Sequence, residues 1–294
     1  MNKQKHLFYF FNLALTFLFS THLTACHAQP AREPATTGFP ASNYFQGKAL
    51  ELAEAVDRND AADIRRLIKE EGVNPDVIFD ESAMPMVAWP VFKKNLPGLK
   101  LLLDNGANPN ARRIDSQRPS GQQRNNALVF AAGNADSRYL SMLLDYGGDP
   151  NTHNSNGEPL TYVATLQDQW PNVKILIERG ADINEGLYAP ESYNTIVAWY
   201  SSFGNFEQVY WLLQHGADPK RTTETQKGSV NKTRMPVVDD IYWLPVKPQV
   251  VEWQRKCQHW LREHGIERQP MPIYMKERRV KLGLPSEEKD IPLL

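Results

Sequence analysis

The side chains that could do chemistry include a cysteine and two histidines close together near the end of the chain. Cys257, His259 and His264 are of types that ligate zinc. On a helix Cys257 and His259 would point in different directions, because positions two apart do not share a face. No second cysteine or cluster of carboxylates accompanies them to complete a tetrahedral site. We therefore expect Cys257 to pack in the core, His259 to lie on the surface, and the chain to need no metal or other cofactor.

Two adjacent carboxylates, Asp239 and Asp240, could form an acid–base pair. They follow a polar segment, residues 222–234, which we interpret as a linker or loop, and adjacent acids in a connector are usually solvated or cap a helix. His153 lies in the polar turn 151–154, which explains it. The sequence contains no Gly-x-Ser-x-Gly elbow, no phosphate-binding glycine-rich loop and no His-Glu-x-x-His. No catalytic residue is predicted, and we expect the protein not to be an enzyme.

The other cysteine, Cys26, follows a segment with the layout of an export signal. Lys3 and Lys5 precede an apolar run over residues 7–19. This run is shorter than the roughly 20 apolar residues of a membrane-spanning helix. Positive charge, a short apolar core and small residues in this order predict a signal peptide over residues 1–25. An ordinary signal peptide with an incidental cysteine is the alternative.

Residues 23–26 read Leu-Thr-Ala-Cys, and this motif resembles the lipobox of bacterial lipoproteins. The resemblance implies that Cys26 is acylated and becomes the first residue of a membrane-anchored chain. Two or three acyl chains bind a bilayer firmly, because each buried methylene contributes about 0.8 kcal/mol. His27 stands where related lipoproteins retained in the inner membrane have Asp. The resemblance therefore implies an outer-membrane protein that faces the periplasm.

The composition is that of a globular protein of one or two domains. The 294 residues are 41% hydrophobic and 23% charged, with a formal net charge of −1. Loss of Lys3 and Lys5 with the signal peptide would lower this charge to −3. A mildly acidic balance argues against nucleic acid as a partner. Residues 26–46 hold Cys26 and a proline-rich spacer.

One phrase recurs five times between residues 67 and 219: an apolar pair, two or three polar residues, a glycine and, shortly after it, Asp or Asn. Glycine ends a helix in the left-handed conformation at little cost, and Asp or Asn suits the turn that follows. Successive glycines are 33 to 41 residues apart, which predicts a stack of helix pairs. These glycines are Gly72, Gly106, Gly147, Gly180 and Gly216.

The phrase and its period resemble the ankyrin repeat. Residues 126–132 and 158–164 are similar to that family's Thr-Pro-Leu-His-x-Ala-Ala, although its Thr and His are mostly absent here. The resemblance covers roughly residues 47–220 and implies an all-α ankyrin-repeat solenoid of about five to six helix-turn-helix repeats with a helical C-terminal cap.

Residues 221–294 are predicted to form a degenerate capping repeat and a tail. The spacing of apolar residues predicts a helix over residues 248–265, with Arg255, Lys256, Gln258 and Arg262 on its outward face. A polar outer face suits a terminal repeat. An enzymatic site in this segment is the alternative, and measurable turnover of a common ester, peptide or glycan substrate would support it.

Four aromatic residues occupy nearly the same place in successive repeats, 17 or 18 residues before the repeat glycine. We expect them to form a row along the first helices, as a packing seam between repeats or as binding area in the groove. These four are Trp89, Phe130, Tyr162 and Trp199; Trp170, Tyr200 and Phe203, near the helix-to-helix turns, are further binding candidates. The long polar loop 112–123 adds Arg112, Arg113 and Arg118, which could meet an acidic partner or form a solvated edge.

The resemblance implies that the protein, expected to be a monomer, binds another protein. Exported ankyrin lipoproteins resemble immunity proteins, which block a secreted antibacterial toxin such as a lipase in the periplasm. The alternative is a periplasmic scaffold that stabilises an endogenous envelope enzyme. In both cases we expect a protein partner, membrane attachment through Cys26 and no nucleic acid.

Overall fold

The computed structural model describes residues 39–119, 122–187, 192–224 and 233–294. Residues 39–294 form one compact unit. The predicted signal peptide, Cys26 and most of the spacer lie outside the described residues. Within the described ranges, no helix combines the length and the apolar character needed to cross a membrane.

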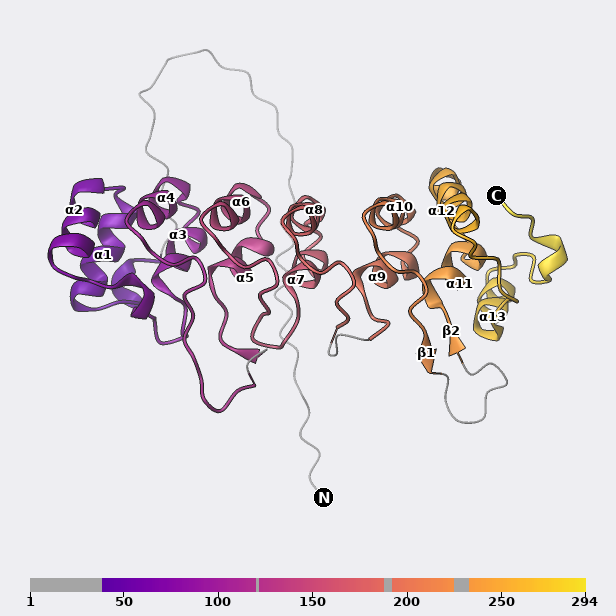
Figure 1. Ribbon diagram of the computed structural model, residues 1–294, viewed down its shortest axis with the longest axis horizontal. Helices are drawn as coiled ribbons and strands as arrows, with labels where there is room; N and C mark the ends of the chain where they lie inside the picture. The colour runs from indigo at the N-terminus through magenta and orange to yellow at the C-terminus, as the bar shows by residue number, and fades with distance from the viewer. Residues whose placement is uncertain (1–38, 120–121, 188–191, 225–232) are drawn as a thin grey trace, which may run out of the picture. The chain divides into compact units, whose positions relative to one another are not determined.

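Helices follow one another in pairs, and the pairs stack in chain order (Figure 1). The first helices of the pairs are α1 (Gly47–Asp57), α3 (Trp89–Phe92), α5 (Ala127–Ala132), α7 (Leu160–Leu166), α9 (Ile196–Ser202) and α11 (Pro236–Trp243). The second helices are α2 (Ala61–Arg65), α4 (Leu96–Asp104), α6 (Arg138–Asp145), α8 (Trp170–Glu178), α10 (Phe206–Gln214) and α12 (Val251–Glu263). The predicted all-α repeat solenoid is thereby confirmed.

Shorter elements complete the chain. A π-helical turn, Arg66–Glu70, extends α2, and a final helix, α13 (Ile273–Lys281), follows the last pair. The strands β1 (Thr223–Glu224) and β2 (Thr233–Arg234) pair antiparallel, with Thr223 opposite Arg234. The 3₁₀ turns are Ala41–Asn43, Pro75–Val77, Met86–Ala88, Pro248–Val250 and Glu288–Asp290.

Residues 236–263 form a sixth helix pair, and α12 ends in the same way as α10. The rings of Trp211 and His215 stack at 3.6 Å, and those of Trp260 and His264 stack at 3.7 Å. The prediction of a helix near residues 248–265 is confirmed. The prediction that Gln258 lies on the outward face is wrong. Gln258 is buried, and its side-chain amide donates to the carbonyl of Ile241.

The sequence prediction is also wrong about the acids at 239 and 240. They lie in α11, not in a connector, and both are buried. The helix begins at Pro236, whose missing N–H costs nothing at a helix start. Its apolar neighbours, including Val237, Val238 and Ile241, pack into the core. The polar segment before α11 does not extend into residues 236–243, although its composition favours a connector there.

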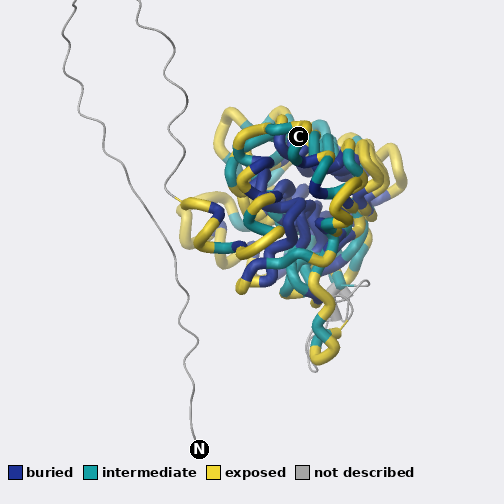
Figure 2. Tube along the Cα trace, turned by 90° about the vertical axis from the view of Figure 1, so that its left-hand side faces the viewer, coloured by how far each residue is buried: buried dark blue, intermediate teal, exposed yellow. Residues whose placement is uncertain are grey.

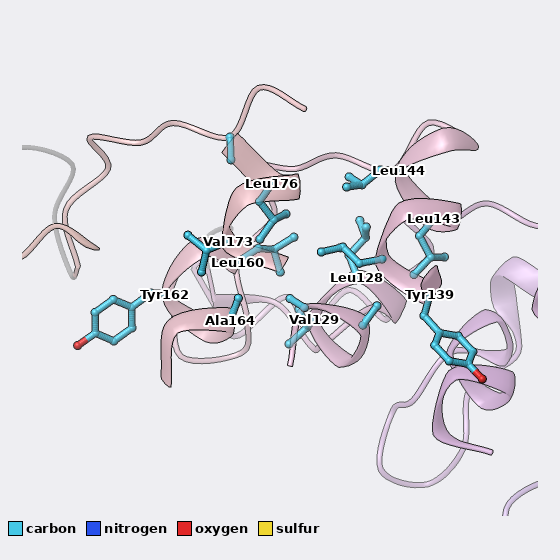
Figure 3. Close-up of a cluster of buried hydrophobic side chains, with 14 of the residues drawn as sticks. Leu128, Val129, Tyr139, Leu143, Leu144, Leu160, Tyr162, Ala164, Val173 and Leu176 are labelled. Atoms are coloured by element: carbon cyan, nitrogen blue, oxygen red, sulfur yellow. The ribbon is translucent and has the colours of Figure 1, made fainter. Parts of the chain in front are cut away.

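The core consists of side chains that meet between neighbouring pairs. Leu128 and Leu143 of one pair and Leu160 and Leu176 of the next are fully buried, and Figure 3 shows these side chains pointing toward one another. Buried residues gather in the middle of the fold, and exposed residues form its outer turns (Figure 2). Because each pair packs mainly on its neighbours, stability is close to a sum of local interfaces.

The repeat glycines adopt the left-handed backbone that the sequence predicts, with φ of 89° at Gly147 and 92° at Gly180. An asparagine then links each of these turns to the next. Asn151 Oδ1 accepts a hydrogen bond from the N–H of Asp182 (2.8 Å), and Asn151 Nδ2 donates to the carbonyl of Gly180 (3.2 Å). The same pair of bonds recurs from Asn110 and from Asn184. These bonds tie neighbouring turns together along the stack.

We expect Asn151→Ala to lower the free energy of unfolding by about 1–2 kcal/mol. The change removes two hydrogen bonds between repeats, each with a net contribution of roughly 1 kcal/mol. Urea unfolding followed by circular dichroism measures the loss. Gln214→Ala, on the exposed surface of α10, is the control and should stay within about 0.5 kcal/mol of the parent. Equal stability of the two variants would contradict this role for Asn151.

Candidate binding face

The first helices and the loops between repeats form one face of the stack, called here the binding face. Within the described residues, two of the hollows of this face include members of the aligned aromatic row. The first has a volume of about 260 Å³ and lies beside α3 and α5. The second has a volume of about 380 Å³ and lies where α7, α9 and α11 meet a repeat loop.

Aromatic rings line the second hollow. Tyr162 of α7 and Trp199 of α9 meet edge to face, with ring centroids 5.5 Å apart. Tyr193 contributes a third ring from the loop before α9 and is 38% exposed. Beside the hollow, Phe203 packs on Trp199 at 5.0 Å and is 65% exposed. In this part of the face the row of first-helix aromatics thus lines a hollow, so its role as binding area stays a prediction here.

A carboxylate shares the second hollow with these rings. Asp240 of α11 lines it and is 8% exposed. Its Oδ2 accepts a hydrogen bond from Ser201 Oγ at 2.9 Å. Burial raises the pKa of Asp240 to about 6, against the hydrogen bond from Ser201. Above that pH the hollow carries a negative charge that little water screens.

The neighbouring acid, Asp239, has a different environment. Its two oxygens accept hydrogen bonds from Nε and Nη2 of Arg234. Arg234 is itself mostly buried and also donates to the carbonyl of Pro270. Burial raises the pKa of Asp239, and Arg234 opposes that rise. This pair is structural, whereas Asp240 belongs to the binding face.

The first hollow mixes aromatic and polar side chains. Phe130 of α5 and Phe92 of α3 lie in its wall, together with Tyr44 from the start of the unit. Asp80 and Arg124 add charge of both signs. Phe130 is thus the only one of the four aligned aromatics that lines this hollow.

Some of the aromatic candidates are not available to a partner. Trp89 is fully buried, and its Nε1 donates to Asp57 Oδ1 at 2.9 Å. Its ring contacts those of Tyr44, Phe45 and Phe92, so at this end the row is a packing seam. The prediction that Trp89 and Tyr200 bind a partner is therefore wrong, because both side chains are buried in the core.

Trp170 belongs to a separate group of rings between helix pairs. It meets Tyr200 edge to face at 5.3 Å and Trp211 at 5.4 Å. The group joins α8 of one pair to α9 and α10 of the next. Trp170 lines neither of the two hollows described above, so its contacts here serve packing.

The arginines of the long loop mainly hold the loop itself. Arg112 donates to the carbonyls of Arg124 and His153. Arg118 donates to the carbonyl of Ser155 at 3.0 Å. Only Arg113 of the three candidate arginines is classed as exposed. In the described part of this loop, Arg113 is therefore the candidate arginine that an acidic partner could reach most easily.

His153 is more than a turn residue. Its Nε2 lies 2.6 Å from Glu185 Oε1, in the next repeat loop, and both side chains are mostly buried. The hydrogen bond to Glu185 raises the pKa of His153, although burial and Arg112 oppose it. The pair of His153 and Glu185 thus joins two loops of the binding face.

This pair predicts a pH-dependent stability. A histidine whose pKa is raised in the folded state stabilises the fold. Its contribution is complete below the unfolded-state pKa of 6.5 and is lost as the pH rises through the folded-state pKa. His153→Gln should therefore destabilise more at about pH 5.5 than at about pH 8.5. Urea unfolding at the two pH values measures the difference. Equal losses at both would show that the ion pair contributes nothing, and Glu185→Gln should give the same pH dependence.

The candidate metal ligands are separated, as expected. Cys257 is fully buried, its Sγ donates to the carbonyl of Phe206, and burial raises the pKa of its thiol. His259 is exposed and pairs with Glu263 on the same helix. Among the described residues, no three His, Cys, Asp or Glu side chains are grouped as metal ligands.

Sequence reasoning missed several residues of the binding face, namely Asp240, Tyr193, Tyr44, Phe92 and Asp80. The apolar residues around Asp240 follow a helical spacing, which could have placed it in a helix. No sequence signal marks the other four: Tyr193 and Asp80 lie in loops, Tyr44 follows an N-terminal turn, and Phe92 ends the short helix α3.

Stacked helix pairs with a hollowed, aromatic face define a helical-repeat protein. Residues 93–186 match the family model for ankyrin repeats, in three copies. Among solved structures, the crystal structure of the ankyrin repeat domain of Bcl-3, described as a unique member of the IkappaB protein family, has the same fold. It is 21% identical, with a TM-score of 0.52, and the match covers 72% of this chain and 85% of that one. Residues 93–186 thus carry ankyrin repeats, and the described chain has the ankyrin-repeat fold.

Proposed function

We propose that this protein is a lipid-anchored immunity protein that binds and neutralises a secreted antibacterial toxin, such as a lipase, in the periplasm. The observation that carries its binding role is the hollow lined by Tyr162, Trp199 and Tyr193. Aromatic side chains are frequent anchors of protein interfaces, because they bury a large area at a low entropic cost. The site for the toxin is the binding face around this hollow.

The anchor is part of the proposal. The motif that ends in Cys26 supports acylation, and His27 supports sorting to the outer membrane. Attachment would concentrate the inhibitor at the surface that a membrane-directed toxin must reach. Cys26→Ser should abolish metabolic labelling with a fatty-acid analogue and release the protein from the membrane fraction. A Cys26→Ser protein that keeps its label would overturn the anchor.

Affinity capture from the native organism tests the function. The bait is residues 27–294, and the matched control carries Trp199→Ala and Phe203→Ala. The proposal expects one stoichiometric partner that is encoded next to this chain, is toxic when exported alone and is lost by the control bait. The toxicity must disappear when this chain is co-expressed. A resident envelope enzyme, whose activity falls when this chain is deleted, would instead establish a periplasmic scaffold.

A further inference from the structure

We propose that the second hollow binds the guanidinium group of an arginine side chain of the partner protein. The inference rests on the proposed function, because it names what the partner inserts into the binding face. The hollow has about 380 Å³, near the small end of the range for ligand pockets. That volume suits one inserted side chain better than a large ligand.

Two neighbouring acids, Asp239 and Asp240, have different partners. Asp239 has a guanidinium of its own in Arg234. Asp240 has only the hydroxyl of Ser201, and in the described part of the chain no lysine or arginine nitrogen lies within ion-pair distance of it. The charged groups that act on Asp240 from further away are Asp239 and Arg278. A buried carboxylate is costly unless a cation pairs with it, so the hollow has an unfilled place for a positive charge.

The walls of the hollow are aromatic. Trp199 and Tyr162 form one wall, with their rings edge to face, and Tyr193 stands on the loop beside them. Aromatic faces attract cations, and tryptophan does so most strongly. A planar guanidinium stacks on such rings while its N–H groups bind a carboxylate, whereas a lysine ammonium acts as a compact point charge. Rings and carboxylate together therefore favour arginine.

The same chain shows the cation–ring contact elsewhere. The guanidinium carbon of Arg268 lies 4.4 Å from the ring centre of Trp243, and Lys256 Nζ lies 4.1 Å from that of Trp253. Those rings have partners within the fold. The wall at Trp199 borders open space that Asp240 also lines, so a guanidinium that enters there would meet both the rings and the carboxylate.

A pair of small probes tests the inference without knowledge of the partner. N-acetylarginine amide is the ligand, and N-acetylcitrulline amide is its neutral counterpart of nearly the same shape. The readout is ¹⁹F NMR of the protein labelled with 5-fluorotryptophan, in which Trp199→Phe identifies the Trp199 signal. At about pH 7.5, above the pKa of Asp240, the arginine probe should shift this signal and bind at least about tenfold more tightly than the citrulline probe.

Variants assign the effect to the carboxylate. Asp240→Asn keeps an oxygen for the Ser201 hydrogen bond and should reduce the affinity for the arginine probe to that for the citrulline probe. Asp145→Asn, on the distant helix α6, should bind as the parent does. Equal affinity for the two probes, no binding of either, or arginine binding that survives Asp240→Asn would overturn the inference. If Asp240→Asn does not fold, the comparison of probes on the parent still decides.

The outcome is separable from the proposed function. A partner that is captured through Trp199 and Phe203, while the two probes bind equally, would keep the binding face and reject the arginine. A cation site confirmed by the probes, with no toxin among the captured proteins, would keep the arginine and reject the immunity role.

Discussion

Replacing Trp89 by alanine is expected to lower the free energy of unfolding by about 3–5 kcal/mol. The side chain is fully buried, and rings of Tyr44, Phe45 and Phe92 surround it. Its removal leaves a cavity that these rigid rings cannot fill without moving. It also takes away the N–H that donates to Asp57, a half-buried carboxylate whose pKa burial raises.

Urea unfolding measures this loss, with the matched variant Phe203→Ala as control. Phe203 is also aromatic and directly follows a first helix, α9, but it is 65% exposed. Its replacement should lower the free energy of unfolding by less than about 1 kcal/mol. Because repeats depend on their neighbours, the Trp89 variant should lose structure first at the N-terminal pairs. A loss below about 1 kcal/mol at Trp89 would show that the seam is not tightly packed.

The second large effect is expected at Arg234, whose replacement by alanine should lower the free energy of unfolding by about 3–5 kcal/mol. Its guanidinium is the partner of Asp239, and the two side chains are only 13% and 2% exposed. Loss of one member leaves the other charge buried without a counterion, which costs far more than the pair itself contributes. The hydrogen bond from Arg234 to Pro270 is lost as well.

Two comparisons separate this explanation from a general sensitivity to arginine loss. Arg138→Ala removes the exposed pair with Asp136, where Arg138 is 72% exposed, and should change stability by less than about 1 kcal/mol. The double variant Arg234→Met, Asp239→Leu removes both buried charges and should be more stable than Arg234→Ala alone. A double variant as unstable as the single one would show that the loss comes from packing or from the bond to Pro270.

The repeat architecture could be predicted because it depends on residues close together along the chain. Each apolar pair, glycine and following Asp or Asn fixes a helix end and a turn within about ten residues of chain. Gly147 and Gly180 therefore adopt the backbone that their spacing predicts. The helix of the sixth pair was predicted from its 3.6-residue period in the same way, whereas α11 was missed because a polar segment precedes it.

The binding face was only partly predictable. Tyr162 and Trp199 occupy equivalent positions, and the structure brings them together at one hollow. Trp89 occupies the same position but is covered by Phe45 and Tyr44, which precede the first repeat. A periodic position determines which way a side chain leaves its helix, but not which other segment lies over it.

The sequence alone thus determined the helix pairs, their order and the candidate aromatic row, since these follow from interactions between residues close along the chain. Only the tertiary structure decided which aromatics are buried, which arginines are used within the loop, and that Asp240 faces a hollow while Asp239 is paired. Burial and pairing depend on neighbours from other repeats: Ser201 lies 39 residues from Asp240, and Asn151 bonds to a turn about one repeat away. No local pattern encodes contacts at that distance, and the function of this surface depends on them.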